Sequence, residues 1–545
     1  MQIVLDIETN YAHDTIWMAA TCDVATKETA VFTDAASLRN YLTKVDSIIG
    51  HNLIGFDVPV LRKVWDIHIE HRKIIDTLVM SRLYNPSLDG GHSLKAWGIR
   101  MGDEQKGDFT DFDNGLTQEM IDYCVQDTIV NANLYHHLVK LMSEAGFSPM
   151  SIDLEHEVAT YTKQQEDNGF CLDFDMACNI SSEHRERMDD IEQQLQAVFP
   201  PIVTERWSEK TGKQLKDDVE VFNVGSRQQI AKRLETKGAV WSQRTDKGAI
   251  VVNEKTLAAL THIPEAALVL EYLTLQKRIG MVNSWIDSYA SDGRVHGRVN
   301  TCGAVTGRMT HSSPNMAQIP SESIYRDCWT VPPGCNLIGI DASGLELRML
   351  AHYMQDEEYT NEILNGDIHT ANQKAAGLET RNQAKTFIYA FLYGAGDAKI
   401  GSIVGGSSAD GKRLKEAFLE NTPALARLRK KVATNAACGS LEGLDGRRVW
   451  VRSEHAALNT LLQSAGAIVM KQALVLAINR LRKNHVPFKL VAQVHDEFQV
   501  EAPEAYAEAV GHTFRNSIRR AGECLELRCP LDGEFKVGIS WADTH

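Results

Sequence analysis

Four carboxylates and one phenol within the first 130 residues have the types and spacing of a metal-dependent site. In "VLDIET", Asp6 and Glu8 are two residues apart, so both would point to the same face of a strand. Adjacent carboxylates repel each other, and a divalent cation between them relieves that repulsion. "HNLIGFD" adds Asp57, and "YCVQD" places Tyr123 and Asp127 one helical turn apart. The set fits two-metal chemistry, with the phenol orienting a water; a solvent-facing edge strand is the alternative for the first pair.

A second acidic set lies far downstream. Asp341 follows the apolar run "LIGI", where a predicted strand ends before a helix begins. Asp496 and Glu497 occupy the tip of a predicted hairpin, in "VHDEF". If that hairpin lies beside the first strand, Asp341 and Asp496 would hold a second pair of metal ions. Ordinary turn chemistry is the alternative explanation for acidic residues at a hairpin tip.

The stretch "RNQAKTFIYAFLYGAG" carries two cations and two rings at intervals of four residues: Arg381, Lys385, Tyr389 and Tyr393. On a helix each residue lies about 40° further round than the one before, so the four form one slowly drifting stripe. A nucleoside triphosphate fits such a stripe, because phosphates bind cations near a helix N-terminus and a ring covers the base or sugar. Thr380 is the expected N-cap. The alternative is a core helix with an exposed basic start.

Length and composition set the frame for these groups. A chain of 545 residues predicts three or four domains, and 43% hydrophobic with 24% charged residues is typical of a soluble globular protein. We expect no membrane segment, no secretion leader, and reduced thiols for the ten scattered cysteines. The net charge of −15 is uneven, since residues 381–489 hold 18 Lys and Arg but 7 Asp and Glu. That block is a candidate polyanion-binding surface, or else a solvated charged face.

The pattern of apolar residues predicts the elements that must position these groups. Strand and helix patterns alternate over the first 145 residues, ending in a helix over 118–142 and a linker over 145–150. Two long helical patterns follow, over 151–169 and 181–199, whereas 200–221 is polar with no clear period. We expect a loop between helices at 405–411 and a hairpin at 488–503. The predicted fold class is therefore α/β and α+β, in several domains.

Taken together, these motifs resemble those of two known protein families. The N-terminal set resembles the proofreading 3′–5′ exonuclease family. "DASGLELRMLAHY", "RNQAKTFIYAFLYGAG" and "VHDEF" occur in the order and spacing of motifs A, B and C of family A DNA polymerases. The chain is similar to the short phage replicative polymerases that recruit host thioredoxin, also through "GAVTGRMTHSSPNMAQIP", "EILNGDIHT" and "LLQSAGAIVMK".

This resemblance implies an RNase H-like 3′–5′ exonuclease domain followed by a right-hand polymerase domain. The implied domains are the exonuclease at 1–145, a mostly helical thumb at 146–290, a first palm segment at 291–352, the fingers at 353–455, and a second palm segment with the catalytic hairpin at 456–545.

The resemblance also implies roles for the polymerase residues. Asp341 and Asp496 would bind two metal ions with the Ala342 carbonyl, and Glu497 would lie nearby. The nucleotide would be held by Arg381, the catalytic Lys385, His369, Tyr389 and Tyr393. Glu346 would pair with Tyr389 and exclude a ribose 2′-hydroxyl. Contacts to the primer–template would come from Arg308, Gln463, His495, Asn315 and Gln318.

For the exonuclease, the resemblance implies metal binding by Asp6, Glu8, Asp57 and Asp127, with Tyr123 completing the site. Both reactions would be two-metal phosphoryl transfers that use two Mg²⁺ per active site, for which Mn²⁺ can substitute. The implied partners are primer–template DNA, deoxynucleoside triphosphates, and a phage helicase–primase and single-strand binding protein. We expect a monomer in the host cytoplasm, with no membrane association.

The sequence departs from the phage pattern in one place. The thioredoxin-recruiting polymerases carry a long basic insertion between two thumb helices, and the corresponding interval here, Pro200 to Val221, is much shorter. We therefore do not expect thioredoxin dependence. Because the exonuclease motifs begin at Met1, we expect no 5′-nuclease domain of the kind that repair-type members have, which favours a role in phage replication.

Two other functions share part of this pattern. A single-subunit RNA polymerase has the palm and the stripe, but Glu346 and the exonuclease motifs argue against it. A nuclease whose polymerase half only binds DNA would not need the complete set of Asp341, Lys385 and Asp496.

The residue at position 389 generates a test of the resemblance. Family members have Phe or Tyr there, and Tyr is associated with ready use of dideoxynucleotides. We expect the wild type, which has Tyr389, to terminate readily on dideoxynucleotides, and Tyr389→Phe to discriminate against them. The ratio of dideoxy- to deoxynucleotide incorporation measures this, and equal refusal by both proteins would contradict the assignment.

Overall fold

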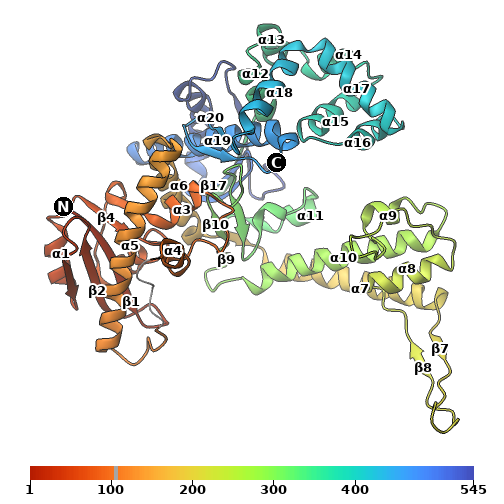
Figure 1. The fold of residues 1–545 in the computed structure, drawn as a ribbon, viewed down its shortest axis with the longest axis horizontal. Coiled ribbons are helices and arrows are strands. Elements are labelled where there is room, and N and C mark those ends of the chain that lie inside the picture. The colour runs from red at the N-terminus through yellow and green to blue at the C-terminus, as the bar shows by residue number, and fades with distance from the viewer. Residues whose placement is uncertain (103–108) are drawn as a thin grey trace. The chain divides into compact units, whose positions relative to one another are not determined.

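The structure, a computed structural model, describes residues 1–102 and 109–545. It divides into two compact units, drawn in Figure 1. Unit 1 comprises Met1–Phe170, Gly297–Ile319 and Val331–His545, and unit 2 comprises Cys171–His296 and Pro320–Thr330. Both units mix helices with strands, which confirms the predicted α/β and α+β class.

Five strands near the N-terminus form one sheet in the order β3-β2-β1-β4-β5. The strand predicted over "QIVLDIET" is confirmed as the central β1, antiparallel to β2 and parallel to β4. The predicted helix over 118–142 is confirmed as α5, which packs along β1 and β2 and buries the apolar face of the sheet (Figure 1). The elements are β1 Gln2–Thr9, β2 Ile16–Asp23, β3 Thr29–Phe32, α1 Ala35–Leu42, β4 Ser47–Gly50, α2 Asp57–Trp65, β5 Ile74–Asp76, α3 Thr77–Tyr84, α4 Leu94–Met101 and α5 Gln118–Ala145.

The predicted linker at 145–150 is shorter than expected. Helix α6 (Pro149–Asn168) begins inside it, because Ser148 caps the helix by accepting a hydrogen bond from the Ser151 N–H and proline suits the first helical position. The two strands β10 (Arg298–Asn300) and β11 (Thr310–Ser312) pair antiparallel, and β10 packs against α6.

A second sheet, in the order β16-β17-β13-β18, is antiparallel throughout. The predicted hairpin at 488–503 is confirmed as β16 and β17, and "LIGIDASGLELRMLAHYM" forms the predicted strand, turn and helix. Helix α20 packs on β13 and β18, and α19 packs on α20. The bounds are β13 Cys335–Ala342, α12 Leu345–Met354, α19 Ala457–Lys483, β16 Lys489–Val494, β17 Glu497–Pro503, α20 Ala507–Cys524 and β18 Gly533–Gly538.

Helices and one small hairpin fill the chain between α12 and α19. The loop predicted at 405–411 is shorter than expected, because Ser407 caps α17 and the helix already begins at Ser408. The elements are α13 Glu357–Asn365, α14 Ile368–Ala376, α15 Arg381–Leu392, α16 Asp397–Ser402, α17 Ser408–Asn421, α18 Pro423–Ala436, β14 Ser440–Glu442 and β15 Arg448–Trp450.

Unit 2 is built on two long helices, α7 and α10, that pack against each other. The polar stretch 200–221, for which the sequence indicated no element, contains the two strands of a hairpin, β7 and β8. Its strands pair only with each other in the described part of the chain, so no buried face imposes an apolar period. The elements are β6 Phe170–Leu172, α7 Phe174–Val198, β7 Ile202–Thr204, β8 Asp218–Glu220, α8 Arg227–Glu235, α9 Glu254–Ala258, α10 Pro264–Asp287, β9 Arg294–Val295, α11 Ser323–Arg326 and β12 Trp329–Thr330.

One helical segment, Glu454–Lys483, is long and apolar enough to cross a membrane. Its most apolar window is 78% buried inside the protein, and the segment includes α19. This is the core helix of unit 1. All ten cysteines are free thiols, as the scattered spacing predicted.

A buried ion network joins α6, the β14–β15 hairpin and α19. Glu155 accepts hydrogen bonds from Arg447 (2.6 Å) and Lys471 (2.5 Å), and Arg447 also pairs with Asp445. All four side chains are at most 2% exposed. Burial alone would raise the pKa of Glu155, but the Lys471 and Arg447 charges lower it from 4.5 to about 2. Its stabilisation is therefore present above about pH 4.5 and is lost as the pH falls toward 2.

Replacing Glu155 with alanine should strongly destabilise the protein, because two buried cations would lose their shared partner. Removing one member of a buried ion pair costs about 3–5 kcal/mol. Urea unfolding should therefore show a clearly lower midpoint. The exposed Glu144→Ala serves as the control and should change stability by less than about 0.5 kcal/mol. Equal midpoints for the two variants would contradict the stabilising role of the network.

Candidate functional site

Strand pairing collects the downstream carboxylates at one end of the second sheet. Asp341 lies at the end of β13, opposite Glu497 of β17 on one side and Glu534 of β18 on the other. Asp496 occupies the turn before β17, and the Ala342 N–H donates to its carbonyl at 3.1 Å. The predicted meeting of Asp341 and Asp496 therefore follows from the sheet register.

The electrostatics of this cluster fit a divalent metal. Burial and, after it, the nearby charges of Asp496, Glu497 and Glu534 together raise the pKa of Asp341 to about 7. A carboxylate in such a place is stabilised in its charged form when a cation shares the site. The Asp341 and Asp496 carboxylates and the Ala342 carbonyl supply the hard oxygen ligands that Mg²⁺ prefers.

Glu497 faces the C-terminal segment of the chain. Its Oε1 accepts from the Trp541 indole N–H at 2.7 Å and from the Gln499 amide, and its Oε2 lies 3.2 Å from His545 Nδ1. The side chain is 8% exposed. These bonds occupy both oxygens, which favours a role in fixing the end of β17. The sequence offered no signal for these partners.

A pocket of about 460 Å³ opens beside Asp341 and Asp496. Its wall combines residues from the sheet β16-β17-β13-β18 and its turns, α12, α15 and α19 with one residue, Arg308, from the loop between β10 and β11. The residues predicted to surround the nucleotide and the primer end that line it are Arg308, Asp341, Ala342, Glu346, Tyr389, Tyr393, His495 and Asp496.

The predicted pairing of Glu346 with Tyr389 is not the one in the structure. Glu346 Oε2 accepts from the Tyr393 hydroxyl at 2.8 Å, and its Oε1 pairs with Arg308 at 3.1 Å. Tyr389 lines the same pocket as Glu346. Burial and then the Glu346 charge raise the pKa of Tyr389. The reason for the difference is reach: the tyrosine one turn further along α15 extends to α12 and takes the carboxylate.

Helix α15 presents the predicted stripe on its outer side. Thr380 caps the helix as expected, in a capping box with Gln383. Phe387, Ile388 and Phe391 face the core, whereas Arg381 and Lys385 are exposed. The N-cap of α14, Asp367, pairs with Arg381 at 2.6 Å, a partner that the sequence did not indicate. The rings of His369 and Tyr389 are 6.3 Å apart, so His369 lies beside the stripe; its predicted contact with the triphosphate stays a prediction.

The residues predicted to contact DNA are not all equally close to this pocket. Arg308 and His495 line it, and Gln463 lies one helical turn before Ala467, another lining residue of α19. Asn315 uses its side-chain oxygen to accept from the Ala317 N–H, and Gln318 is exposed. The roles of these last two remain predictions.

At the N-terminal site, Asp6 and Glu8 lie side by side on β1, as the strand period required. Their ligand atoms and the Cys124 thiol all lie within 4.8 Å of one another. Asp57 begins α2 and accepts from the Ile7 N–H at 3.1 Å, which anchors it beside β1. Burial and then the Asp6 charge raise the pKa of Asp57. A shift of this kind is expected for carboxylates that lie close together and can share a cation.

Helix α5 brings the last two predicted residues of this site. Cys124 of this helix lies beside Asp6 and Glu8, and burial raises its pKa, followed by the charges of Asp6, Glu8, Asp127 and Asp57. Asp127 lies one helical turn from Tyr123 on α5, as the sequence predicted. Tyr123, the neighbour of Cys124, packs its ring against Phe109 and Phe112 at 5.7 and 6.3 Å. Cys124 was missed in the sequence because a single buried cysteine carries no spacing signal.

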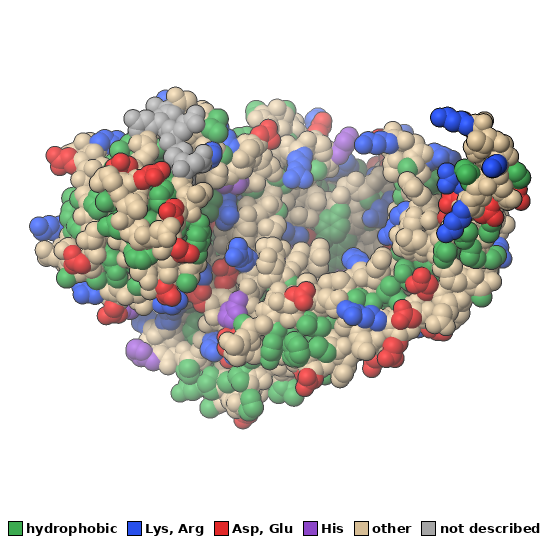
Figure 2. All heavy atoms as spheres, turned by 90° about the horizontal axis from the view of Figure 1, so that it is seen from below, with side chains coloured by type: hydrophobic (Ala, Val, Ile, Leu, Met, Phe, Trp, Pro, Cys, Tyr) green, Lys and Arg blue, Asp and Glu red, His purple; other side chains and the backbone are tan. Residues whose placement is uncertain are grey.

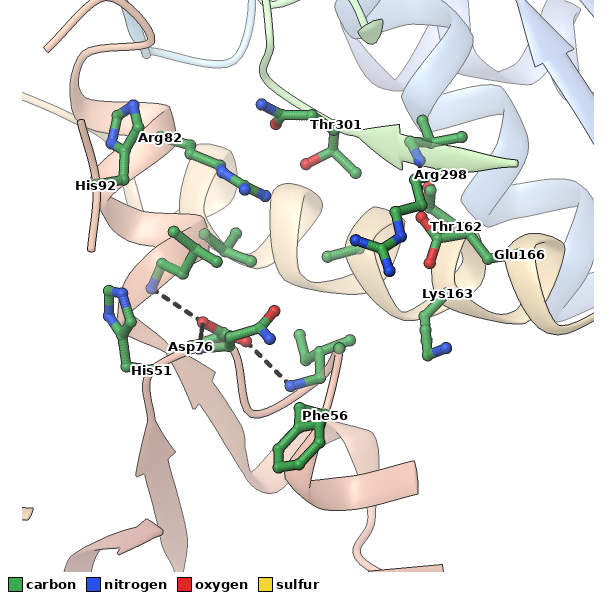
Figure 3. Close-up of a pocket in the computed structure, with 18 of the residues that line it drawn as sticks. His51, Phe56, Asp76, Arg82, His92, Thr162, Lys163, Glu166, Arg298 and Thr301 are labelled. Carbon is green, nitrogen blue, oxygen red and sulfur yellow. Dashed lines mark hydrogen bonds between the residues drawn. The ribbon is translucent and has the colours of Figure 1, made fainter. Parts of the chain in front are cut away.

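A cavity of about 1060 Å³ lies next to the N-terminal site, and Phe56, the residue before Asp57, lines it. Figure 3 shows Arg82 pointing into this cavity, with Arg298 from β10 on another wall. The buried Nε of Arg82 has no hydrogen-bond partner among the described residues. The basic residues of the lining are His51, Arg82, His92, Lys95, Lys163 and Arg298. The sequence did not indicate this basic cavity, since its walls come from segments more than 200 residues apart.

Comparison with known proteins places the chain in a family. The family model described as "DNA polymerase family A" matches residues 202–543. The DNA-directed DNA polymerase of Escherichia phage T7 is 36% identical over 91% of this chain and 92% of its own length, and that of Enterobacteria phage T3 is equally similar. DNA polymerase I of Aquifex aeolicus is 25% identical over 91% of the chain and 88% of its own.

A solved structure shares the fold. The POL domain of Pol1 from M. smegmatis, in complex with a DNA primer-template and dNTP, superposes with a TM-score of 0.82 at 19% identity, covering 99% of this chain and 95% of that one. The chain belongs to DNA polymerase family A.

Proposed function

We propose that this family A polymerase extends a DNA primer and also removes nucleotides from its 3′ end, each at its own two-metal carboxylate site. The observation that carries the proposal is the presence of two separate carboxylate clusters, one around Asp341 and one around Asp6. In each, burial and like charges raise the pKa of a carboxyl group, which is the electrostatic condition for binding a divalent cation.

In the polymerase site, Asp341, Asp496 and the Ala342 carbonyl would hold the metals, for which Mg²⁺ or Mn²⁺ is suited. When bound, two such ions lower the pKa of the primer 3′-hydroxyl and stabilise charge on the phosphorus centre. Arg381, Lys385 and His369 bind and orient the triphosphate, Tyr389 covers its base or sugar, and pyrophosphate leaves. Primer–template contacts come from Arg308, Gln463, His495, Asn315 and Gln318.

The Glu346 pairings support a selection step at this site. With Glu346 bonded to Tyr393, the ring of Tyr393 occupies a wall of the pocket. Movement of α15 onto a correct base pair would release Tyr393 from the carboxylate and bring Tyr389 to it. Closure then depends on the shape of the pair, which is induced-fit selection. The Glu346–Tyr389 pair predicted from the sequence would thus belong to the closed state.

In the exonuclease site, Asp6, Glu8, Asp57 and Asp127 would hold the metals, and Tyr123 would orient the attacking water. The basic cavity supports a single-stranded substrate here. Its half-buried Arg82 has an unsatisfied donor, and burying a charged donor without a partner is costly unless a ligand supplies one. A strand phosphate fits both the charge and the geometry of a guanidinium.

We assign the exonuclease to residues 1–145, the thumb to 146–290, the palm to 291–352 and 456–545, and the fingers to 353–455. The setting that fits is phage DNA replication in the host cytoplasm, as a monomer. Deoxynucleoside triphosphates are the substrates, and a helicase–primase and a single-strand binding protein are the expected partners. Thioredoxin is not required.

Two variants should separate the activities. Asp496→Asn should lose extension by on the order of 10³-fold, because a metal ligand contributes several kcal/mol to the transition state, and should keep exonuclease activity. Asp6→Asn should do the reverse. One end-labelled primer–template, with and without deoxynucleotides, reports both reactions. Undiminished extension by Asp496→Asn would refute the metal assignment, and absence of shortening by the wild type would refute the exonuclease.

Glu346→Ala should relax selection against ribonucleotides. Removing the carboxyl side chain enlarges the pocket where Glu346 would clash with a 2′-hydroxyl. Such clashes in a packed site cost about 1–3 kcal/mol. We therefore expect the ratio of kcat/KM for ribo- over deoxynucleotides to rise roughly 5- to 160-fold. Glu358→Ala, an exposed acid on α13, is the matched control. An unchanged ratio in Glu346→Ala would rule out this role.

A further inference from the structure

Helices α14 and α15 pack against each other, and a short hydrogen-bonded turn joins them. The Leu378 N–H donates to the Gln373 carbonyl at 2.9 Å, and the Gln373 side-chain amide donates to the Glu379 carbonyl at 2.8 Å. Thr380 and Gln383 then form the capping box that begins α15. The first turn of α15 is therefore anchored to α14.

Asp367, the N-cap of α14, uses both of its carboxylate oxygens. Oδ1 accepts from the His369 and Thr370 N–H groups at 3.1 and 3.4 Å, and Oδ2 accepts from the Thr370 hydroxyl at 2.9 Å. The same Oδ2 accepts from Arg381 Nε at 2.6 Å. The hydrogen bonds from Arg381 and then from Thr370 hold the pKa of Asp367 well below its usual value. The carboxylate is therefore both fixed in place and charged.

This contact occupies one edge of the Arg381 guanidinium. A guanidinium has one N–H donor at Nε and four on its two terminal nitrogens. Among the residues that the structure describes, Asp367 engages Nε, and the terminal nitrogens form no hydrogen bond. Two terminal nitrogens are sufficient for the paired hydrogen bonds that arginine makes to a phosphate. Asp367 therefore holds Arg381 by the edge that a phosphate does not need.

Stability alone gives little reason for this ion pair. The side chains of Arg381 and Asp367 are 53% and 42% exposed, and exposed ion pairs contribute little to folding. Such pairs are ordinary in this protein, since Figure 2 shows basic and acidic side chains interspersed over the face that it draws. This pair differs because three further hydrogen bonds fix its acid, and because its base is the proposed ligand of the triphosphate.

We propose that Asp367 is a positioning residue for the incoming nucleotide, which fixes the Arg381 guanidinium with its terminal nitrogens free to meet the triphosphate. The proposal rests on the proposed role of Arg381 in binding that triphosphate. An arginine that is already ordered loses less conformational entropy when a ligand binds it, so the fixed side chain binds more tightly than a free one. Competition between Asp367 and the triphosphate would require both to use the same donors, whereas Asp367 uses only Nε.

Asp367→Asn tests the proposal without removing the helix cap. Asparagine caps helices about as well as aspartate, and its amide oxygen can keep the hydrogen bonds from the α14 backbone. Its amide NH₂ group then faces Arg381 Nε, and because both groups are donors, the link to Arg381 is lost. The matched control is Asp356→Asn at the N-cap of α13, because Asp356 also caps a helix but forms no ion pair with a described residue.

The measurement is single-nucleotide incorporation by the full-length protein on a primer–template with Mg²⁺. It gives KM for the deoxynucleotide and kcat for the wild type, Asp367→Asn, Asp356→Asn, Arg381→Ala, and the double variant of Asp367→Asn with Arg381→Ala. Urea unfolding of each protein verifies that the midpoints are equal, so that a change in KM is not a change in folding.

We expect Asp367→Asn to raise KM roughly 2- to 13-fold, the cost of ordering one free arginine on binding. Its kcat should stay unchanged, because the positioning acts on binding of the triphosphate. Arg381→Ala should raise KM more, by roughly 13- to 160-fold, since it removes the charged hydrogen bonds themselves. In the double variant, loss of Asp367 should add nothing, and Asp356→Asn should match the wild type.

Two results would contradict the proposal in different ways. If Arg381→Ala raises KM but Asp367→Asn leaves it unchanged or lowers it, the positioning role is overturned and Arg381 remains a triphosphate ligand. If Arg381→Ala leaves KM unchanged, the triphosphate role of Arg381 is refuted, and the positioning role falls with it.

Discussion

Repulsion between carboxylates that the sheet β16-β17-β13-β18 forces together is the constraint around which this polymerase is built. Strand register places Asp341 between Glu497 and Glu534, and the hairpin turn adds Asp496. The backbone cannot relax this repulsion, because Asp341 is held by ladders on both sides. The C-terminal segment engages Glu497, which leaves Asp341 and Asp496 as the pair open to the pocket. A divalent cation is then the natural counter-charge for that pair.

Such a site needs a rigid base, and the buried network around Glu155 supplies one. It ties α6, which follows the N-terminal sheet and α5, to the β14–β15 hairpin and to α19. Arg447 packs beneath Gly307, immediately before Arg308 in the loop that lines the polymerase pocket. The same hairpin contacts the N-terminal segment, since Arg448 donates to the Ala145 carbonyl and Trp450 to that of Tyr84. Both carboxylate clusters therefore belong to one compact unit.

Helix α15 is only partly buried. Helix α15 buries its aromatic side chains but leaves its cations exposed, and a single charged hydrogen bond, from Tyr393 to Glu346, joins its C-terminal end to α12. A bond of this kind contributes about 1.5–3 kcal/mol, which binding of a nucleotide can outweigh.

Local patterns in the sequence determined most of the elements and nearly all of the candidate catalytic residues. The strand β1, the helices α5 and α15, the Thr380 cap and the β16–β17 hairpin follow from side-chain periods, capping and turn preferences, which act over a few residues. The side-by-side placement of Asp6 and Glu8 follows from the same strand period. The order and spacing of the motifs that contain Asp341 and Asp496 predicted that the two residues share one site. The pairing of β13 with β17 brings them together in the structure.

What only the tertiary structure decided are the partners that distant segments supply. Tyr393 rather than Tyr389 holds Glu346, Asp367 holds Arg381, and Trp541 and His545 hold Glu497. Cys124 and the basic cavity with Arg82 are likewise set by how helices and strands pack. The strands of the hairpin at 200–221 were not predicted from the sequence. Neither face of the hairpin is buried, so its sequence shows no alternation of apolar and polar residues. Periodicity records which face of an element is buried, but it does not record which side chain on another element lies against that face.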